Sequence, residues 1–420
     1  MSKRTYRAKN IKDVDLEKLI SRVEGRRIAV GVDVAKTKFH AALVDEERRI
    51  IVNVKWEHPQ QTNDFVALIK ALPSSLTEVV MEPSGTYGDA LRYALLGQDI
   101  PVFRVSAKRT HDAKEVYDGV PSKHDAKDAV IIARLRLDGA GQWWPMKNDL
   151  EGDLSAALST LDIFQGQYVQ NLNRLEACSA RHWPELSAII DLDTSTVLVL
   201  LRDIGGPADV VKNLAKARKL MTNTGGSLLS QEKIDAVIAS ASATIGVPVC
   251  RGEKAALKAL AADALRAKKE CRRARIRLEK LSSGNATLKS MGEVVGKCTA
   301  AVLFSEVGDP LNYKSAAAYE KSAGLNIIEH SSGKHQGRRK ISKRGSGMAR
   351  RWLFLAALRL INQNSVVRAW HERKIAREGG KRKMLSVVAI MRKYIRALWH
   401  VAHGAVFDPT LKYDLERLGL

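Results

Sequence analysis

Apolar residues in the first part of the chain occur in short runs with two different periods. Runs rich in β-branched residues predict five strands, which are Ile28–Val34, Phe39–Val44, Arg49–Lys55, Leu76–Met81 and Pro101–Val105. Spacings of three and four predict three helices, which are Gln60–Leu72, a segment through Leu91 and Leu95, and His124–Leu135. Because only short polar turns separate the first three strands, we expect an antiparallel meander followed by alternating helices and strands. This order indicates an α/β sheet domain over residues 1–145.

The middle of the chain has a heptad period, in which seam residues alternate at spacings of three and four. The first seam comprises Leu154, Ala157, Leu161, Phe164, Tyr168, Asn171, Leu175 and Cys178. The second comprises Leu257, Leu260, Ala264, Ala267, Cys271, Ala274, Leu278 and Leu281. This period is typical of coiled coils. We expect two long helices that pair within the chain, as an antiparallel hairpin, or between protomers; either helix alone would equally suit packing on a globular body.

The last part of the chain is mostly helical in its pattern. Leu288–Gly308 predicts two short helices joined by a glycine turn, similar to a helix-hairpin-helix, and Trp352–Ile361 predicts an apolar core helix. Trp370 and Trp399 follow, and each either packs on a helix face or stacks on a nucleic-acid base. We therefore expect three domains: residues 1–145, a coiled-coil spacer with an inserted helical segment over 146–285, and a mostly α domain over 286–420.

Composition adds a class of partner to this picture. The chain has 420 residues, 45% of them hydrophobic, so its domains can bury real cores. Its formal net charge is +23 and its pI is about 9.9, an excess that favours a polyanion, above all nucleic acid. Part of this charge forms a basic face on the second seam helix, made by Lys258, Arg266, Lys268, Lys269, Arg272, Arg273, Arg275 and Arg277.

Cysteine usage and hydropathy bear on the compartment. The four cysteines are far apart and show no CxxC spacing, which argues against a zinc site or a disulfide framework and fits a reducing cytosol. The basic start MSKRTYRAKN has no apolar core behind it, and no apolar run approaches the length of a membrane span. We therefore expect a cytoplasmic protein with no membrane partner.

Four carboxylates punctuate the predicted α/β domain. Asp33 lies near the end of the first strand and Glu82 directly follows the fourth, while Asp125 and Asp128 are three residues apart on the last helix. Carboxylate oxygens are preferred ligands of magnesium, and a pair of such ions can clamp a phosphodiester in transfer. The opposing interpretation is structural: Asp33 begins a turn, and the helical pair forms a solvated face with its flanking lysines.

A basic, glycine-rich stretch marks the C-terminal domain. From Gly333 to Arg351 there is no acidic residue. The basic residues are Lys334, Arg338, Arg339, Lys340, Lys343, Arg344, Arg350 and Arg351. Such a density suits contact with phosphates. Ser331 and Ser332 directly precede the stretch, and each is interpreted either as a turn or cap residue or as a nucleophile attacking a phosphate held by guanidinium groups.

The motifs GVDVAK, MEPSGTYGDAL and SKHDAKDAVIIARL resemble the DEDD transposases of one class of bacterial insertion sequence, a family that includes the Piv-type DNA invertases. The resemblance implies a RuvC-like N-terminal domain with the ribonuclease H fold. It also implies that four matching positions are catalytic and bind magnesium (Mg²⁺); they are Asp33, Glu82, Asp125 and Asp128.

The stretch SSGKHQGRRKISKRGSGMAR resembles the second signature of the same family, in which the serine directly before the glycine is the nucleophile. That position is Ser332, and Ser331 is its near rival. Two departures from the family pattern occur: Ser346 replaces the usual Asn or Asp, and the turn near Gly292 lacks the usual proline, which weakens its expected phosphate contact.

The resemblance implies a site-specific DNA recombinase guided by a structured bridge RNA. It would cut and rejoin donor and target DNA through a phosphoserine intermediate, as a homodimer or homotetramer whose protomers share the site. Two alternatives stay open on the residues alone. One is a metal-dependent RuvC-like nuclease or junction resolvase without a serine nucleophile, and the other is a non-catalytic nucleic-acid-binding protein.

Overall fold

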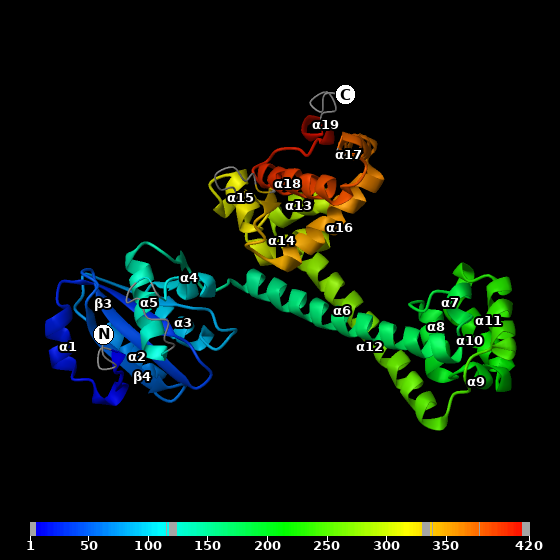
Figure 1. The fold of residues 1–420 in the computed structure, drawn as a ribbon, viewed down its shortest axis with the longest axis horizontal. Coiled ribbons are helices and arrows are strands. Elements are labelled where there is room, and N and C mark those ends of the chain that lie inside the picture. The colour runs from blue at the N-terminus through cyan, green and yellow to red at the C-terminus, as the bar shows by residue number, and fades with distance from the viewer. Residues whose placement is uncertain are drawn as a thin grey trace. The chain divides into compact units, whose positions relative to one another are not determined.

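The computed structural model describes residues 6–114, 116, 124–329, 337, 339–377 and 379–413. The chain divides into two compact units, Met1–Lys147 and Asn148–Leu420, called here the N-terminal unit and the C-terminal unit (Figure 1). No helix in the described part of the chain combines the length and the apolar character that crossing a membrane would require.

A mixed seven-stranded sheet forms the centre of the N-terminal unit, in the order β1-β4-β3-β2-β5-β6-β7. Its strands are β1 (Lys9–Asn10), β2 (Arg27–Asp33), β3 (Lys38–Asp45), β4 (Ile50–Glu57), β5 (Leu76–Met81), β6 (Val102–Arg104) and β7 (Gln142–Trp143). Strands β2, β3 and β4 pair antiparallel, which confirms the predicted meander, and β5 and β6 continue the sheet in parallel with β2. This order fits a ribonuclease H-like domain. The edge strands β1 and β7 were not predicted, because two residues are too few to show a period.

Helices cover both faces of this sheet. They are α1 (Leu16–Val23), α2 (Thr62–Lys70), α3 (Asp89–Leu96), α4 (Ala107–Asp112) and α5 (Asp125–Leu137). Alternate residues of β2 point to opposite faces. Ile28, Val30 and Val32 share a core with α1, α2 and α3, whereas Ala29 shares a core with α5. The two sides of the sheet are therefore covered by different helices.

Gly31 on β2 allows α5 to pack directly on the strand backbone. A Cβ at this position would lie 2.1 Å from the Ala129 carbonyl oxygen and 2.3 Å from the Ala133 nitrogen. No other residue fits so close an approach. The contact fixes the start of α5 beside the end of β2, which is where the predicted acidic residues lie.

The predicted pair of long helices is present in the C-terminal unit as α6 (Asp149–His182) and α12 (Arg251–Ser282) (Figure 1). Asn148 caps the start of α6. They pair within the chain and run antiparallel, because Arg277 near the end of α12 contacts Asp153 at 3.0 Å and Glu253 at its start contacts His182 at 3.6 Å. Most of the expected seam residues are buried, among them Leu154 and Leu278.

The segment between the long helices forms a helical body with its own core. Its helices are α7 (Leu186–Ile189), α8 (Ser195–Asp203), α9 (Pro207–Lys212), α10 (Leu214–Gly225) and α11 (Gln231–Ala243). Trp183, Leu200 and Val237 are part of this core, together with Leu175 of α6 and Leu257 of α12. The body therefore sits on the far end of the helical hairpin.

The remaining helices pack around the other end of the hairpin, in a core that Leu154 and Leu278 join. They are α13 (Ala286–Val295), α14 (Lys297–Val307), α15 (Ala316–Ser322), α16 (Gly347–Gln363), α17 (Ser365–Arg377), α18 (Lys383–Ala402) and α19 (Pro409–Lys412), with the short strands β8 (Ile327–Ile328) and β9 (Lys340–Ile341). Gly296 alone joins α13 to α14, with a φ of 85°. Trp370 is buried against Tyr413, so it packs on a helix face.

Candidate active site

The predicted acidic residues lie at one edge of the N-terminal sheet. Asp33 is the last residue of β2, and the register pairs Val32 with Met81, so Glu82 directly follows the strand beside it. Because β2 and β5 are parallel, both carboxylates emerge at the same end of the sheet. The packing of α5 on Gly31 brings Asp125 and Asp128 to this end.

The other three carboxylates lie within electrostatic range of Asp33. The pKa of the Asp33 carboxyl is raised to about 6, first by burial and then by the negative charge of neighbouring carboxylates. These neighbours are, in order of effect, Asp128, Asp125 and Glu82. The predicted set is therefore brought together in space, and it carries more negative charge than its protein surroundings offset.

Asp128 is the most buried member, with 9% of its surface exposed. Its Oδ2 accepts a hydrogen bond from the Lys114 ammonium at 3.1 Å. Its Oδ1 is buried and has no hydrogen-bond partner among the described residues. A buried carboxylate oxygen without a donor is costly, and a bound cation would relieve that cost.

Asp125 is more open, since 63% of its side chain is exposed. Its Oδ2 lies 3.7 Å from Nδ1 of His40, which pairs with Asp33 in the β2–β3 register. Burial lowers the pKa of His40, so the ring is neutral near pH 7. No sequence pattern indicated His40 or Lys114, because His40 reaches Asp125 from a strand distant in the chain and Lys114 follows α4, outside the acidic motif that contains Asp128.

The structural interpretation of the helical pair expected a solvated face. Lys127 is instead 2% exposed, and Asp128 beside it is also buried. Lys123 lies outside the described residues. The first turn of α5 is thus only partly solvated, since Asp125 is exposed whereas the charged side chains of Lys127 and Asp128 are buried, and this arrangement differs from a solvated helix face.

The donor set fits a divalent metal, because it offers carboxylate oxygens, an unpartnered oxygen on Asp128 and an excess of negative charge. Within the described ranges, no three His, Cys, Asp or Glu side chains are gathered tightly enough to enclose an ion. Binding a metal would therefore require the carboxylates to draw closer together.

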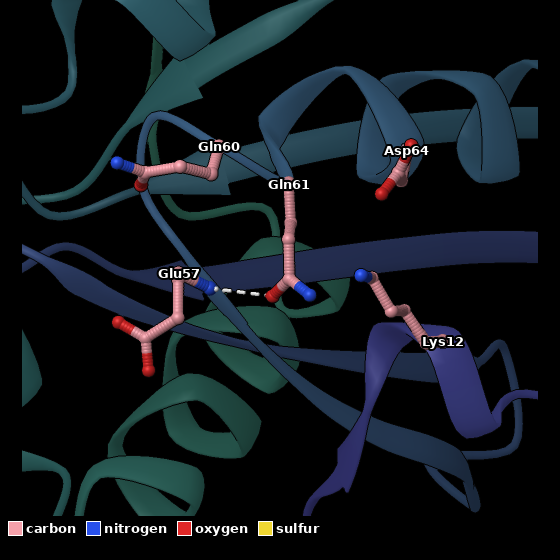
Figure 2. Close-up of a pocket in the computed structure, with 5 residues that line it drawn as sticks. All are labelled: Lys12, Glu57, Gln60, Gln61 and Asp64. Carbon is pink, nitrogen blue, oxygen red and sulfur yellow. Dashed lines mark hydrogen bonds between the residues drawn. The ribbon is translucent and has the colours of Figure 1, made fainter.

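A shallow pocket of about 450 Å³ lies elsewhere in the N-terminal unit (Figure 2). It is lined by Lys12, Glu57, Gln60, Gln61 and Asp64. The Glu57 backbone N–H donates to Gln61 Oε1 at 2.8 Å across it. None of the four candidate carboxylates lines this pocket, so it is separate from the candidate site.

The C-terminal candidate residues are described only in part. Ser331, Ser332, Lys334 and Arg338 lie outside the described residues. Among the others, three side chains have structural partners. Arg339 contacts Glu329 at 2.8 Å, and Arg351 lies 3.9 Å from Asp162.

Arg350 is the third, and it donates hydrogen bonds to the carbonyl oxygens of Ala323 and Gly345 at 3.2 and 3.0 Å. Lys340, Lys343 and Arg344 are exposed, and within the described part of the chain their side chains make no hydrogen bond or ion pair. Within the basic stretch from Gly333 to Arg351, these three are therefore the described residues that are free to contact a ligand.

Comparison with known proteins gives two family matches. A DEDD transposase model of the IS110 type, described as a transposase, matches residues 30–182. A model described as the transposase IS116/IS110/IS902 family matches residues 286–372. The first match contains all four candidate carboxylates, and the second contains the candidate serine with the eight basic residues.

Individual relatives point to the same kind of protein. The insertion element IS110 uncharacterized 43.6 kDa protein of Streptomyces coelicolor is 26% identical over 303 residues, which cover 70% of this chain and 73% of the relative. Pilin gene-inverting proteins of Moraxella bovis and Moraxella lacunata are 26% and 25% identical over 183 residues. Those matches cover 39% of this chain and 53% of each relative, so they span about half the length of these two relatives.

Proposed function

Because this chain belongs to the IS116/IS110/IS902 family of transposases, enzymes of DNA recombination, we propose that it moves an insertion sequence by cutting and rejoining DNA at specific sites. The observation that carries the proposal is the convergence of Asp128, Asp125 and Glu82 on the half-buried Asp33. Like charges gathered in this way are typical of catalytic metal sites. The partners are donor and target DNA.

In this proposal Asp33, Glu82, Asp125 and Asp128 hold magnesium. A divalent ion bound there polarises phosphoryl oxygens and offsets the negative charge that develops during phosphoryl transfer. The protein's own contribution is to hold the backbones of β2 and α5 in place, since they touch at Gly31, so that side-chain movement alone would draw the carboxylates together. Lys114 holds Asp128 in place from its other side and keeps part of the charge neutralised.

We propose Ser332 as the nucleophile. Its Oγ forms a bond to a DNA phosphorus, and the bond from that phosphorus to the 3′ oxygen breaks. The serine hydroxyl gives its proton to solvent, and the leaving 3′ oxygen takes up a proton from solvent. The products are a 5′-phosphoserine link and a free 3′ hydroxyl, and attack by another 3′ hydroxyl reverses the link and reseals the strand.

The basic residues around Ser332 bind the DNA phosphates in this scheme. Lys340, Lys343 and Arg344 are the best supported, because their exposed side chains are not used by the fold. A structured bridge RNA supplies the sequence specificity through base pairing, as the family resemblance implies. Two or four protomers associate in the bacterial cytoplasm, so that the carboxylates of one protomer act with the serine of another.

A denaturing gel of the full chain with magnesium, donor DNA, target DNA and RNA from the element's flanks tests this proposal. We expect a slow-migrating protein–DNA adduct with the wild type and none with Ser332→Ala or Asp125→Ala. Ser331→Ala is the matched control and should keep the adduct. Cutting that survives in Ser332→Ala without any adduct would mean a metal-only nuclease and would contradict the serine mechanism.

A further inference from the structure

The two helices of the hairpin in the C-terminal unit carry opposite net charge. Helix α12 has eleven basic and four acidic residues, whereas α6 has two basic and five acidic residues. The helices pack against each other along their seams, so the remaining side chains face outward from the pair. A charge difference of this size on paired helices of similar length indicates that α12 has a role that α6 does not share.

Many basic residues of α12 are used by the fold itself. Arg273 pairs with Glu270 at 2.6 Å and Arg277 with Asp153 at 3.0 Å. Lys268 donates to the Asp193 carbonyl oxygen at 2.6 Å. These side chains attach α12 to its own turns, to α6 and to the inserted body, so their presence needs no ligand.

Lys269, Arg272 and Lys280 are different, and we call them the outer stripe. All three are exposed, and within the described part of the chain their side chains make no hydrogen bond or ion pair. Spacings of three and eight residues place them on one helix face, opposite the buried seam. The stripe spans about 16 Å along the helix axis, at 1.5 Å per residue.

The outer stripe is held on a rigid part of the molecule. The segment of α12 that carries it buries Cys271, Ala274 and Leu278 in the same core as Ala349 and Leu353 of α16. The orientation of this segment of α12 is therefore fixed by its packing on α16, the helix that begins shortly after the basic residues Lys343 and Arg344. A stripe fixed in this way presents its charges at a constant spacing, which a flexible basic tail would not do.

We propose that the outer stripe of α12 is a docking surface for the backbone of double-stranded DNA. Charge complementarity supports a polyanion, and the enzyme class acts on DNA. Because the enzyme class recombines DNA, duplex DNA is the occupant, and binding of an RNA duplex is an outcome of the test. The inference rests on the DNA-recombinase activity and not on Ser332, the metal or the guide RNA.

The test measures DNA binding by the full-length protein in EDTA, so that cutting chemistry plays no part. The probe is a labelled duplex of roughly 30 base pairs, titrated from about 50 to 200 mM salt. The stripe variant carries Lys269→Gln, Arg272→Gln and Lys280→Gln. The control variant makes the same change in charge on the inserted body, with Lys212→Gln, Lys216→Gln and Lys219→Gln, which are also exposed.

We expect the stripe variant to bind the duplex roughly tenfold more weakly at low salt, with the slope of log K against log salt reduced by about 2 to 3, because about 0.9 of a counterion is released per phosphate contact. The control variant should keep the wild-type slope. Both variants should melt at the wild-type temperature, since all six side chains are exposed.

Equal slopes for the stripe variant and the wild type would overturn the proposal, as would an equal loss in the control variant. An RNA duplex of the same sequence forms a further arm. A loss of RNA binding with unchanged DNA binding would contradict the assignment to DNA. Because no cleavage is measured, failure here leaves the adduct experiment unaffected, and failure of the adduct experiment leaves this result unaffected.

Discussion

Carboxylates near the two ends of β2 have opposite surroundings. At the start of β2, Glu78 on the neighbouring strand contacts Arg27 at 2.7 Å and also contacts Arg136, and burial that would raise its pKa is outweighed by these arginines, which lower it. At the end of β2, burial and three neighbouring carboxylates raise the pKa of Asp33 to about 6.

Asp45 resembles Glu78, because it is a buried carboxylate that arginines neutralise. It is 1% exposed, and Arg49 and Arg26 bind its carboxylate at 3.0 and 2.9 Å. The difference teaches how to separate structural from functional acids in this domain. Acids of the fold have arginines that neutralise them, whereas at the candidate site Asp128 is contacted by a lysine, Lys114.

The largest expected effect comes from Asp128→Asn. It should lower DNA recombination by roughly a thousandfold or more, because several kcal/mol of transition-state stabilisation by a bound metal would be lost. The melting temperature in EDTA should not fall, since the change removes like-charge repulsion at Asp33. Asp64→Asn, at the separate pocket, is the matched control and should keep full activity. A drop in stability with unchanged activity would show that Asp128 is structural.

Glu78→Gln should have the reverse effect at the other end of β2. Removing one member of a buried ion pair leaves Arg136 uncompensated, so the free energy of unfolding should fall by about 2 to 4 kcal/mol. The Arg27 side chain is 42% exposed, which keeps the loss below that of a fully buried pair. Denaturant unfolding measures the change, and activity per folded molecule should stay at the wild-type level. A wild-type unfolding curve together with lost recombination would show that Glu78 acts in function and not in stability.

Asp45 predicts a pH dependence of stability. Burial alone would raise its pKa, but hydrogen bonds from Arg49 and Arg26 lower that pKa below 3.8 in the folded chain. Its contribution is therefore present above the unfolded pKa and is lost as the pH falls from about 4 toward the folded value. In Asp45→Asn, the acid-side loss of melting temperature should be smaller than in the wild type. Identical pH profiles would contradict this account.

Lys114→Met should give the smallest effect. Without the ammonium at 3.1 Å from Asp128, the metal-free protein should lose about 1 kcal/mol of unfolding free energy at neutral pH, because the acidic cluster is then less neutralised. Magnesium should restore that loss, so the rise in melting temperature on adding the ion becomes larger than in the wild type. Lys108→Met on α4 is the control. An unchanged response to magnesium would show that Lys114 is not part of the site.

Sequence patterns located the strands and the four carboxylates of the N-terminal unit, because alternation and strand-end acids are local features. Two kinds of feature escaped them. The edge strands β1 and β7 are two residues long and show no period. The arginines that neutralise Glu78 and the contact of His40 with Asp125 join elements distant in the chain, and Lys114 reaches Asp128 from outside the acidic motif, so no local pattern encodes these contacts.

The helical hairpin was predicted as a pair of seams, but the same seams suit pairing within the chain or between protomers. The contacts of Arg277 with Asp153 and of Glu253 with His182 show that the chain pairs with itself in antiparallel fashion. The predicted roles of Ser332, Lys334 and Arg338 stay predictions, since these residues lie outside the described part of the chain.

The most direct test of the central claim is binding of Mn²⁺, a spectroscopic substitute for magnesium, measured by electron paramagnetic resonance on the full-length protein. Wild type, Asp33→Asn and Asp128→Asn are compared with Glu78→Gln, which alters a buried carboxylate at the other end of β2. The account predicts that wild type and Glu78→Gln bind the ion and that both other variants lose it. Equal binding by all four proteins would contradict the claim that these carboxylates form the metal site.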